Sequence, residues 1–371
     1  MSLSLPVDSP RTRSLTEVVP EMLAAMEGGG SWLAPATSAI VVVLDGLGAR
    51  NLAARAGHAR YLAQAGGRRD VARSVFPSTT ATALTGLLTG ASAGEHGVVG
   101  YRARVPGTDA VVNQLRGWEG GELPDGWQRA APLTAGRRSF AVSKREYAET
   151  GFTRATLGGA QFHGEDDLSA RVDIAVDLAA RHPGSFTYLY APDLDMVGHR
   201  RGWESDEWIA ALEGVDAAMR RLGESLAPEV GAIVTADHGM VDVPRHRHVL
   251  LSDGDDLVEG VRLIGGEPRM LHLYTQGGAA ADVLRRWDTA EGHRAWVLSR
   301  ADAIQAGLFG AVDAAVRERI GDVLVAARGG IAYYDDRLAD KGPQRMVGQH
   351  GSLTDEERTV PLIRLGAFAT R

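Results

Sequence analysis

The 371-residue sequence predicts an α/β fold: a mostly parallel sheet with helices on both faces, plus a small inserted α+β subdomain. Three observations support this prediction. Short apolar runs alternate with segments of helical periodicity, which is typical of a parallel sheet covered by helices. Three of these runs lead directly into acidic or histidine residues, and ligands of open α/β sheets bind at that edge. The sequence pattern of the chain also changes between about residues 261 and 334.

The first apolar runs predict buried parallel strands. Residues 39–44 form a continuous apolar run rich in valine that stops at Asp45 and Gly46. Between residues 206 and 226 the apolar positions recur at helical spacing. The remaining core elements are predicted on the same grounds as helices at 14–26, 80–88 and 168–180 and strands at 139–142, 185–190 and 231–235.

The later part of the chain predicts a separate small unit. Strand patterns at 270–275 and 296–299 flank a helical pattern at 279–287. We therefore expect an inserted subdomain at 261–334 and a core built from 14–260 and 335–371.

The composition excludes several classes of protein. Hydrophobic content of 44% with 23% charged residues is ordinary for a globular chain. A net charge of −7 argues against a polynucleotide-binding surface, whereas a small anionic substrate is still allowed if bound cations dominate the local field. There are no cysteines, so any metal must be held by His and carboxylate side chains.

The chain shows no feature of a membrane protein. Residues 1–13 are polar and contain Pro6 and Pro10, without the apolar segment of a signal peptide. No apolar run approaches the length of a membrane span. We expect a soluble, cytoplasmic protein without a membrane partner, and the sequence gives no indication of its oligomeric state.

Two patches place metal-binding side chains at strand ends. Asp45 is followed by Gly46, which leaves room for an ion beside the backbone, although such a patch is also typical of a plain strand-to-helix turn. Asp237 and His238 are adjacent, so on a strand they would point to opposite faces. Gly239 allows the chain to leave the strand, and both side chains could then reach one ion.

Two further patches supply His ligands. Asp195 and His199 are four residues apart, so one turn of helix or a tight loop would direct both toward one point. Asp193 competes for the ligand role, and the spacing favours Asp195; a surface ion pair or a helix cap is the alternative. His350 lies in a loop among glycines, where many histidines are simply solvated.

A threonine at a helix start is the candidate nucleophile. A hydroxyl there lies among unpaired backbone N–H groups at the positive end of the helix dipole, which favours a phosphorylated hydroxyl. Thr79 or Thr80 could alternatively act only as the helix cap.

Together the patches supply three Asp, three His and one hydroxyl. Nitrogen and oxygen ligands without sulfur suit two zinc ions, which can clamp the attacking and leaving oxygens of an in-line displacement. A free threonine is a poor nucleophile, so it would have to lie in the metal shell.

This set of motifs resembles the alkaline phosphatase superfamily, and most closely its nucleotide pyrophosphatase/phosphodiesterase branch. In that family a Thr lies sixteen residues before the His of a His-Gly pair, with a Thr-Gly pair between. Counting back from His96 gives Thr80, with Thr89-Gly90 in place, whereas Thr79 does not fit. The motifs Asp-x-x-Gly-His and Asp-His-Gly-Met stand at 195–199 and 237–240.

The resemblance implies an alkaline-phosphatase-like core with Thr80 as the catalytic nucleophile. It also implies two Zn²⁺ sites, although other divalent metals would fit the same ligand types. One zinc would be held by Asp195, His199 and His350, and the second by Asp45, Asp237, His238 and Thr80.

The expected activity is hydrolysis of phosphodiester or nucleotide pyrophosphate bonds in a small phosphorylated substrate such as a nucleotide. The family's diesterases carry an Asn where this chain has Tyr101, and Asn113 could substitute for it. Lys144 follows a predicted strand and could reach the substrate, or it could be a solvated loop lysine. No arginine accompanies Thr80 in the motif, which favours a diester over a monoester dianion.

Other members of the superfamily fit the sequence less well. The alternative that we retain is a phosphomonoesterase or phosphonate hydrolase with the same metals and nucleophile. A sulfatase would need a Cys or Ser motif that Thr80 lacks, and a mutase usually carries Ser with manganese. A degenerate member that only binds ligand would be expected to have lost a metal ligand, and here the full set is present.

Overall fold

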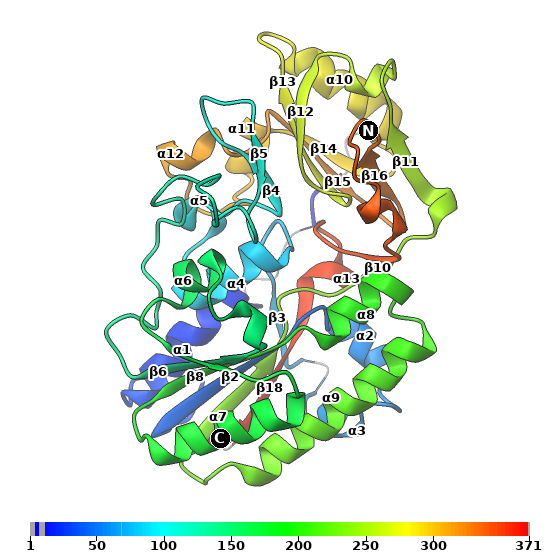
Figure 1. Cartoon of the computed structure of the whole chain (residues 1–371). Coiled ribbons are helices and arrows are strands. Elements are labelled where there is room, and N and C mark those ends of the chain that lie inside the picture. The colour runs from blue at the N-terminus through cyan, green and yellow to red at the C-terminus, as the bar shows by residue number, and fades with distance from the viewer. Residues whose placement is uncertain (1–3, 7–11, 68, 370–371) are drawn as a thin grey trace.

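The structure is a computed structural model that describes residues 4–6, 12–67 and 69–369. Its main unit is built on an eight-stranded sheet, drawn in the lower half of Figure 1. Along the sheet the strands lie in the order β1 (Arg13–Ser14), β3 (Val71–Arg73), β18 (Thr359–Gly366), β9 (Val230–Thr235), β2 (Ser38–Leu44), β8 (Phe186–Ala191), β6 (Ser139–Ser143) and β7 (Gln161–Gly164).

The sheet is parallel except at one strand. β2 pairs in parallel with both β8 and β9, and β6 pairs in parallel with β8 and β7. The C-terminal strand β18 runs antiparallel between β3 and β9. The predicted α/β fold with a mostly parallel sheet is therefore confirmed, whereas β18 was not expected.

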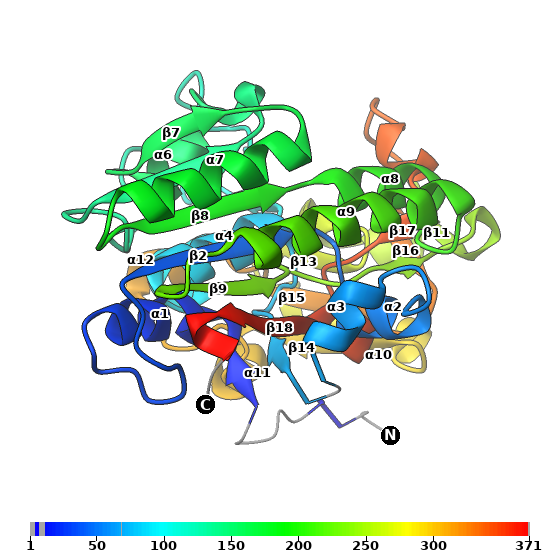
Figure 2. The ribbon, with the colours of Figure 1, turned by 90° about the horizontal axis from the view of Figure 1, so that it is seen from below.

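The central strands are buried because helices cover both faces of the sheet (Figure 2). Every residue of β2, β8 and β9 is buried, which explains their continuous apolar sequences. The covering helices are α7 (Leu168–Arg181), α9 (Asp206–Ser225) and α3 (Arg60–Ala65) on one face and α1 (Val18–Met26) and α4 (Thr80–Thr89) on the other.

A second unit, drawn in the upper half of Figure 1, has its own sheet and apolar core. Its antiparallel strands lie in the order β12 (Val261–Glu267), β13 (Met270–Thr275), β15 (Val323–Ala327) and β14 (Ala295–Ser299), with α10 (Ala280–Glu291) packed on them. Beside this sheet β11 (His248–Leu251) pairs in parallel with β16 (Ala332–Asp335). The domain limits at residues 261 and 334 stay a prediction, and Leu251 of β11 already belongs to this apolar core.

The remaining elements are short and lie around the two sheets. The helices are α2 (Ala49–Ala54), α5 (Ala93–His96), α6 (Gly151–Leu157), α8 (Asp193–Arg201), α11 (Arg300–Gln305), α12 (Ala314–Arg317), α13 (Asp355–Arg358) and the 3-10 turn η2 (Arg145–Tyr147). The short strands are β4 (Arg102–Arg104), β5 (Val111–Asn113), β10 (Val241–Asp242) and β17 (Gly348–Gln349).

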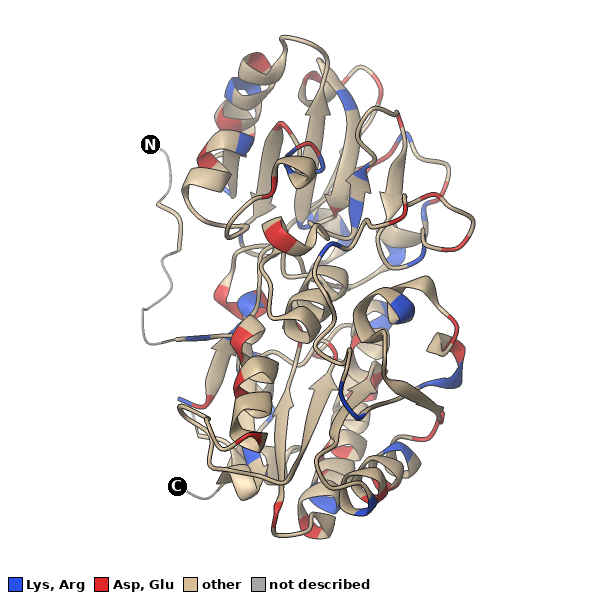
Figure 3. Ribbon diagram, turned by 90° about the vertical axis from the view of Figure 1, so that its left-hand side faces the viewer, with Lys and Arg blue, Asp and Glu red and all other residues tan. Residues whose placement is uncertain are grey.

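Charged residues are spread over both units. In Figure 3 Lys and Arg are interspersed with Asp and Glu, and the central strands of the main sheet are uncharged. Within the described ranges, none of the helices combines the length and the apolarity needed to cross a bilayer.

Candidate active site

The site is assembled at the ends of three neighbouring strands. β9, β2 and β8 run in parallel, so their C-terminal ends lie at one edge of the sheet. Asp45 directly follows β2, Asp237 follows β9 after one residue, and α8 begins just after β8. Side chains that are far apart in the sequence are thereby brought together, as the strand-end patches predicted.

The first group of side chains is fully buried. Ligand atoms of Asp45, Asp237 and His238 lie within 4.8 Å of one another. Nε2 of His238 is 3.3 Å from an oxygen of each carboxylate and 3.1 Å from Oγ1 of Thr80. We call these three residues the buried group.

The second group is more open. Asp195 and His199 face each other across one turn of α8, with Oδ1 and Nε2 3.4 Å apart, and Nε2 of His350 is 4.0 Å from the same oxygen. Asp195 and His199 are half-buried. The ring of His350 stacks on that of His238 at 3.5 Å, so this open group adjoins the buried group.

In all three histidines the same ring nitrogen, Nε2, is left free to bind a ligand. Nδ1 of His199, His238 and His350 lies 2.7, 3.1 and 3.0 Å from a backbone carbonyl oxygen. A carbonyl only accepts, so Nδ1 carries the proton and Nε2 keeps its lone pair for a ligand. Burial, with the two neighbouring histidines, also holds the pKa of His350 well below its usual range.

In the described part of the chain the only basic side chains within ion-pair distance of the three carboxylates are histidines, and no Lys or Arg forms an ion pair with them. Oδ1 of Asp45, Oδ1 of Asp195 and Oδ2 of Asp237 are buried without a hydrogen-bond partner in the described part of the chain. The other oxygen of Asp237 is anchored by the backbone N–H groups of Gly46 and His238, at 3.2 and 3.0 Å.

The electrostatics of this cluster call for cations. Burial raises the pKa of Asp45 well above its usual range, and the negative charges of Asp237 and Asp195 raise it further. Without a cation this crowding of carboxylate oxygens and imidazole nitrogens favours a proton on Asp45, because the charged form is repelled by its neighbours and poorly solvated. Divalent metal ions with nitrogen and oxygen ligands resolve this repulsion, and the donor set fits zinc.

Thr80 is the first residue of α4, and its hydroxyl faces the buried group. The preceding Thr79 occupies the N-cap position, but its side chain makes no capping hydrogen bond. Its hydroxyl instead donates to the carboxylate of Glu267, at the end of β12 in the second unit. The hydroxyl of Thr80 is thus directed at the buried group of the main unit, and the hydroxyl of Thr79 at the second unit.

Sequence reasoning missed Tyr190. Its hydroxyl donates to Oδ2 of Asp45, which leaves Oδ1 of that carboxylate free. Tyr188 and Tyr190 alternate on β8 and their rings stack at 6.1 Å, so both project from one face of the strand. That spacing of two at the end of a predicted strand was the available signal.

A cavity of about 360 Å³ opens beside Thr80. Its wall includes Leu84 and Leu88 of α4, Tyr147 of η2 and Tyr190 of β8. Arg116 also lines it, so the structure brings an arginine close to Thr80 that the motif does not contain. The motif around Thr80 contains no arginine, and chain folding rather than sequence proximity brings Arg116 to the cavity wall.

The three predicted substrate-binding residues lie around the site in different ways. Tyr101 and Asn113 are not among the residues that line the cavity. Oδ1 of Asn113 accepts the backbone N–H groups of Leu115 and Arg116 at 2.8 and 3.2 Å. Nζ of Lys144 lies 3.4 Å from Sδ of Met196, next to Asp195 on α8.

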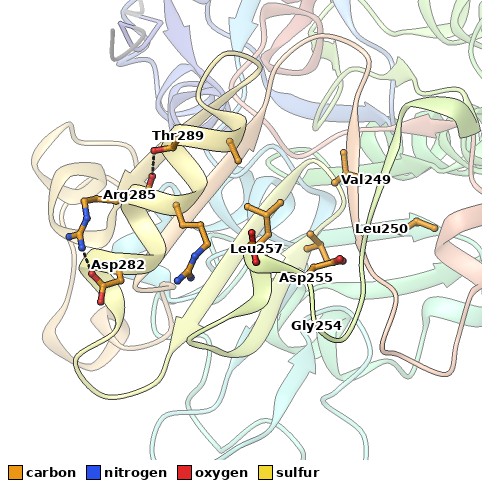
Figure 4. Close-up of a pocket in the computed structure, with 12 residues that line it drawn as sticks. Val249, Leu250, Gly254, Asp255, Leu257, Asp282, Arg285 and Thr289 are labelled. Carbon is orange, nitrogen blue, oxygen red and sulfur yellow. Dashed lines mark hydrogen bonds and ion pairs between the residues drawn. The ribbon is translucent and has the colours of Figure 1, made fainter.

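A larger cavity, about 1050 Å³, lies in the second unit between β11 and α10 (Figure 4). Its arginine Arg285 pairs with Asp282, and Thr289 donates to the carbonyl of Arg285 at 2.7 Å. None of the predicted ligands or the nucleophile lines it. Despite its smaller size, the cavity beside Thr80 is therefore the one connected with the candidate chemistry.

Curated relatives of the chain are ectonucleotide pyrophosphatases/phosphodiesterases. Family member 7 from Homo sapiens is 27% identical over 186 residues, which is 46% of this chain and 40% of the relative. Its counterpart from Rattus norvegicus is 26% identical over 198 residues, 49% of this chain and 45% of the relative. The matched region thus spans less than half the length of these relatives.

Solved structures share the fold. Murine ectonucleotide pyrophosphatase/phosphodiesterase 5 superposes with a TM-score of 0.66 at 20% identity, covering 87% of both chains. Phosphonoacetate hydrolase from Sinorhizobium meliloti 1021, in complex with phosphonoformate, gives a TM-score of 0.65 at 21% identity over 90% of both chains.

The family itself is established from the sequence. The model of the type I phosphodiesterase/nucleotide pyrophosphatase family matches residues 39–353, which contain both side-chain groups and Thr80. This range is most of the 371-residue chain. The chain belongs to the type I phosphodiesterase/nucleotide pyrophosphatase family.

Proposed function

We propose that this chain is a two-zinc hydrolase of phosphodiester or nucleotide pyrophosphate bonds that works through a covalent intermediate on Thr80. The observation that carries the proposal is the position of the Thr80 hydroxyl. It lies 3.1 Å from Nε2 of His238, between the buried group and the cavity of about 360 Å³. A phosphoryl group held at the two side-chain groups would therefore meet a nucleophile and leave its substituent in the cavity.

The ligand roles follow from the free lone pairs. One zinc would be held by Asp195, His199 and His350, and the other by the buried group together with Thr80. When bound, such ions supply positive charge for the phosphoryl oxygens and lower the pKa of a coordinated hydroxyl. Lys, Arg and His residues beyond these groups are not needed for that part of the chemistry.

The covalent step that we propose balances as follows. Oγ1 of Thr80 gives its proton to water and forms a bond to phosphorus while the bond from phosphorus to the leaving oxygen breaks, and the leaving oxygen takes a proton from water. A second water then attacks phosphorus, the Thr80–phosphorus bond breaks, and the threonine hydroxyl is restored. The N-terminal N–H groups of α4 favour the anionic phosphothreonine, because Thr80 is the first residue of that helix.

The cavity supports a diester or anhydride substrate. A monoester has no second substituent to place there, whereas a diester does. The aromatic and aliphatic wall suits a group of moderate size and low charge, and Arg116 adds one cation. A small nucleotide is consistent with the murine relative, one structure of which is described as a complex with AMP. The cytoplasmic location stays a prediction.

A phosphomonoesterase or phosphonate hydrolase is the second candidate. Lys144 favours it, because its ammonium group lies beside α8, which also carries Asp195 of the open group. Together with Arg116 it could neutralise the extra charge of a dianion. The structural likeness to phosphonoacetate hydrolase concerns the fold alone.

The test is a side-by-side assay of zinc-loaded protein with bis(4-nitrophenyl) phosphate and 4-nitrophenyl phosphate. We expect kcat/KM for the diester to exceed that for the monoester by at least about tenfold, or about 1.4 kcal/mol of transition-state binding. Equal or better monoester turnover that is lost in Lys144→Ala would move the protein to the second candidate. No turnover of either ester by protein with full zinc content would refute both.

A further inference from the structure

We propose that Tyr147 is a further catalytic residue, whose hydroxyl donates a hydrogen bond to a phosphoryl oxygen of the substrate attacked by Thr80. The inference rests on the proposed function, because it assigns a role within the same phosphoryl-transfer site. It concerns a residue that none of the sequence motifs contains.

The position of Tyr147 connects it with both the cavity and the metal-binding side chains. It ends η2, directly after β6, and it lines the same cavity as Thr80. Its ring lies edge-on to that of Tyr190, with centroids 6.1 Å apart and planes at 60°. Because the Tyr190 hydroxyl donates to Asp45, Tyr147 is separated from the buried group by one aromatic ring.

The hydroxyl of Tyr147 is available for a ligand. Among the tyrosines on this wall, Tyr190 is committed to Asp45, and Tyr188 is buried on the same strand. Tyr147 is half-buried, and in the described part of the chain its hydroxyl is engaged in no hydrogen bond that would have to break. A donor left open toward a cavity in this way is positioned for an acceptor on the bound molecule.

The charges around Tyr147 keep the hydroxyl protonated. Burial, followed by the carboxylates of Glu146, Asp45, Asp195 and Asp193, raises its pKa to about 12. A neutral phenol is a donor that binds an anionic oxygen without adding a charge of its own.

The geometry also indicates which oxygen is bound. Oxygens of the phosphoryl group that face the buried and open groups would be held by the metal ions of these sites. An oxygen turned toward the cavity would meet the cavity wall, where Leu84 and Leu88 offer only carbon. Arg116 and Ser143 also line this wall, and the ring of Tyr147 there contacts that of Tyr190, the tyrosine hydrogen-bonded to Asp45. Charge develops on such oxygens during phosphoryl transfer, so a fixed donor there stabilises the transition state.

The test compares Tyr147→Phe with the wild type, using zinc-loaded protein and a chromogenic substrate that the wild type hydrolyses. We expect kcat to fall by about ten- to a hundredfold, with KM within about threefold and zinc content unchanged. Tyr61→Phe is the matched control, because Tyr61 lies on α3, which packs on α9 away from the cavity. That variant should retain wild-type kcat.

Two further measurements separate a donor to a phosphoryl oxygen from other roles. On a phosphorothioate diester, whose sulfur accepts hydrogen bonds poorly, Tyr147→Phe should lose less activity than on the oxygen substrate. With 4-nitrophenyl and phenyl leaving groups the loss should be the same. A kcat within twofold of the wild type, equal losses with oxygen and sulfur substrates, or a loss confined to the phenyl leaving group would each overturn the proposal.

The outcome is independent of the substrate class. Preference for a monoester would refute the diester assignment, and the ratio of Tyr147→Phe to wild type would then be measured on that monoester. Because the proposed donor contacts the transferred group, the same decrease is expected with either ester. A decrease in zinc content in Tyr147→Phe would assign the residue to metal-site structure and would also overturn the proposal.

Discussion

The C-terminal edge of the main sheet and the face of the second unit that docks on it are built from different kinds of polar residues. The sheet edge carries six carboxylate and imidazole side chains whose facing atoms have few protein partners. The docking face carries the buried residues Glu267 and His272, each of which hydrogen-bonds to a neighbouring segment, although Oε1 of Glu267 and Nε2 of His272 have no partner in the described part of the chain. The two meet at Thr79 and Thr80.

This difference indicates that the main unit carries the reacting groups and that the second unit holds them in place. Unpartnered buried lone pairs are costly unless a cation or substrate satisfies them, so the sheet edge is organised around ligands that bind there. Within the described ranges, Glu267 and His272 lie singly and not in a group of metal-ligand type, and their hydrogen bonds to neighbouring segments hold the chain in place. Each of the following predictions tests this division.

The largest effect is expected at the adjacent threonines. Thr80→Ala should lower kcat by at least about a thousandfold, because it removes the nucleophile, while fold and zinc content stay largely intact. Thr79→Ala should lower kcat by less than about tenfold, because Thr79 contacts only Glu267 of the second unit. Steady-state kinetics with circular dichroism would check both, and a reversed order of the two losses would contradict the division.

Only substitutions at the edge of the main sheet should change the zinc content of the protein. We expect about two zinc ions per chain after dialysis, because two groups of ligands are present. His199→Ala removes a ligand of the open group and should lower the content to about one ion per chain. His272→Gln should keep both ions, since His272 belongs to the docking face.

Elemental analysis of dialysed protein measures this stoichiometry. A chelator should abolish activity without unfolding the chain, because the large apolar core does not depend on the metals. A folded wild type that reproducibly binds no metal would remove the basis of the assignment.

Much of the sheet edge could be predicted from the sequence because local signals coincide there. The strand at residues 39–44 and the helix at 206–226 have strong periodicity, and the structure has β2 at Ser38–Leu44 and α9 at Asp206–Ser225. Asp45, Asp195 and His238 stand in or next to short motifs at strand ends. Because each of them follows a strand of a parallel sheet, their positions in the sequence were enough to predict that they lie at one edge.

The remaining contacts depend on long-range packing that no local pattern encodes. Glu267 reaches Thr79 only because β12 docks against the main unit, and Arg116 lines the cavity although 36 residues separate it from Thr80 in the sequence. β18 is a strand of eight residues near the end of the chain, and its antiparallel pairing with both β3 and β9 joins segments far apart in the sequence. Such features require the folded structure.

Acid should weaken the docking face before it weakens the rest of the core. Burial, with Arg300, lowers the pKa of His272 to about 3, and its Nδ1 accepts the backbone N–H of Gly321 at 3.0 Å. The folded state therefore keeps His272 neutral, whereas the unfolded chain takes up a proton below pH 6.5. The contribution of His272 to the free energy of unfolding is fully present above pH 6.5 and decreases as the pH falls toward 3.

The size of this loss can be estimated from linkage. Because His272 stays neutral in the folded state, the free energy of unfolding should decrease by about 1.3 kcal/mol when the pH is lowered from 7.5 to 5.5. His272→Gln should lack this increment, because Gln has no proton to gain and can still accept from Gly321. Urea unfolding of both proteins at the two pH values measures the difference. Identical pH dependence in wild type and variant would show that His272 titrates freely in the folded state.

The smallest effect is expected at Glu267, and it distinguishes a positioning role from a catalytic one. Its carboxyl accepts the hydroxyl of Thr79 and packs against Gly351, next to His350. Glu267→Ala leaves the Thr79 hydroxyl without its acceptor and should lower kcat about fivefold, corresponding to about 1 kcal/mol for one lost hydrogen bond. Glu267→Gln keeps an acceptor of the same size, so kcat should stay within about twofold of the wild type. Zinc content should be unchanged in both variants.

The charge of Glu267 makes the comparison sharper at higher pH. Burial raises its pKa to about 8, while the Thr79 hydrogen bond opposes the shift, so at pH 7 the wild-type side chain is mostly protonated and resembles Gln. Wild type and Glu267→Gln should therefore have matching kcat at pH 7 and should diverge above pH 8, where only the wild type gains a buried charge. If Glu267→Gln loses as much activity at pH 7 as Glu267→Ala, the carboxyl group itself takes part in the reaction. The second unit would then supply chemistry as well as position.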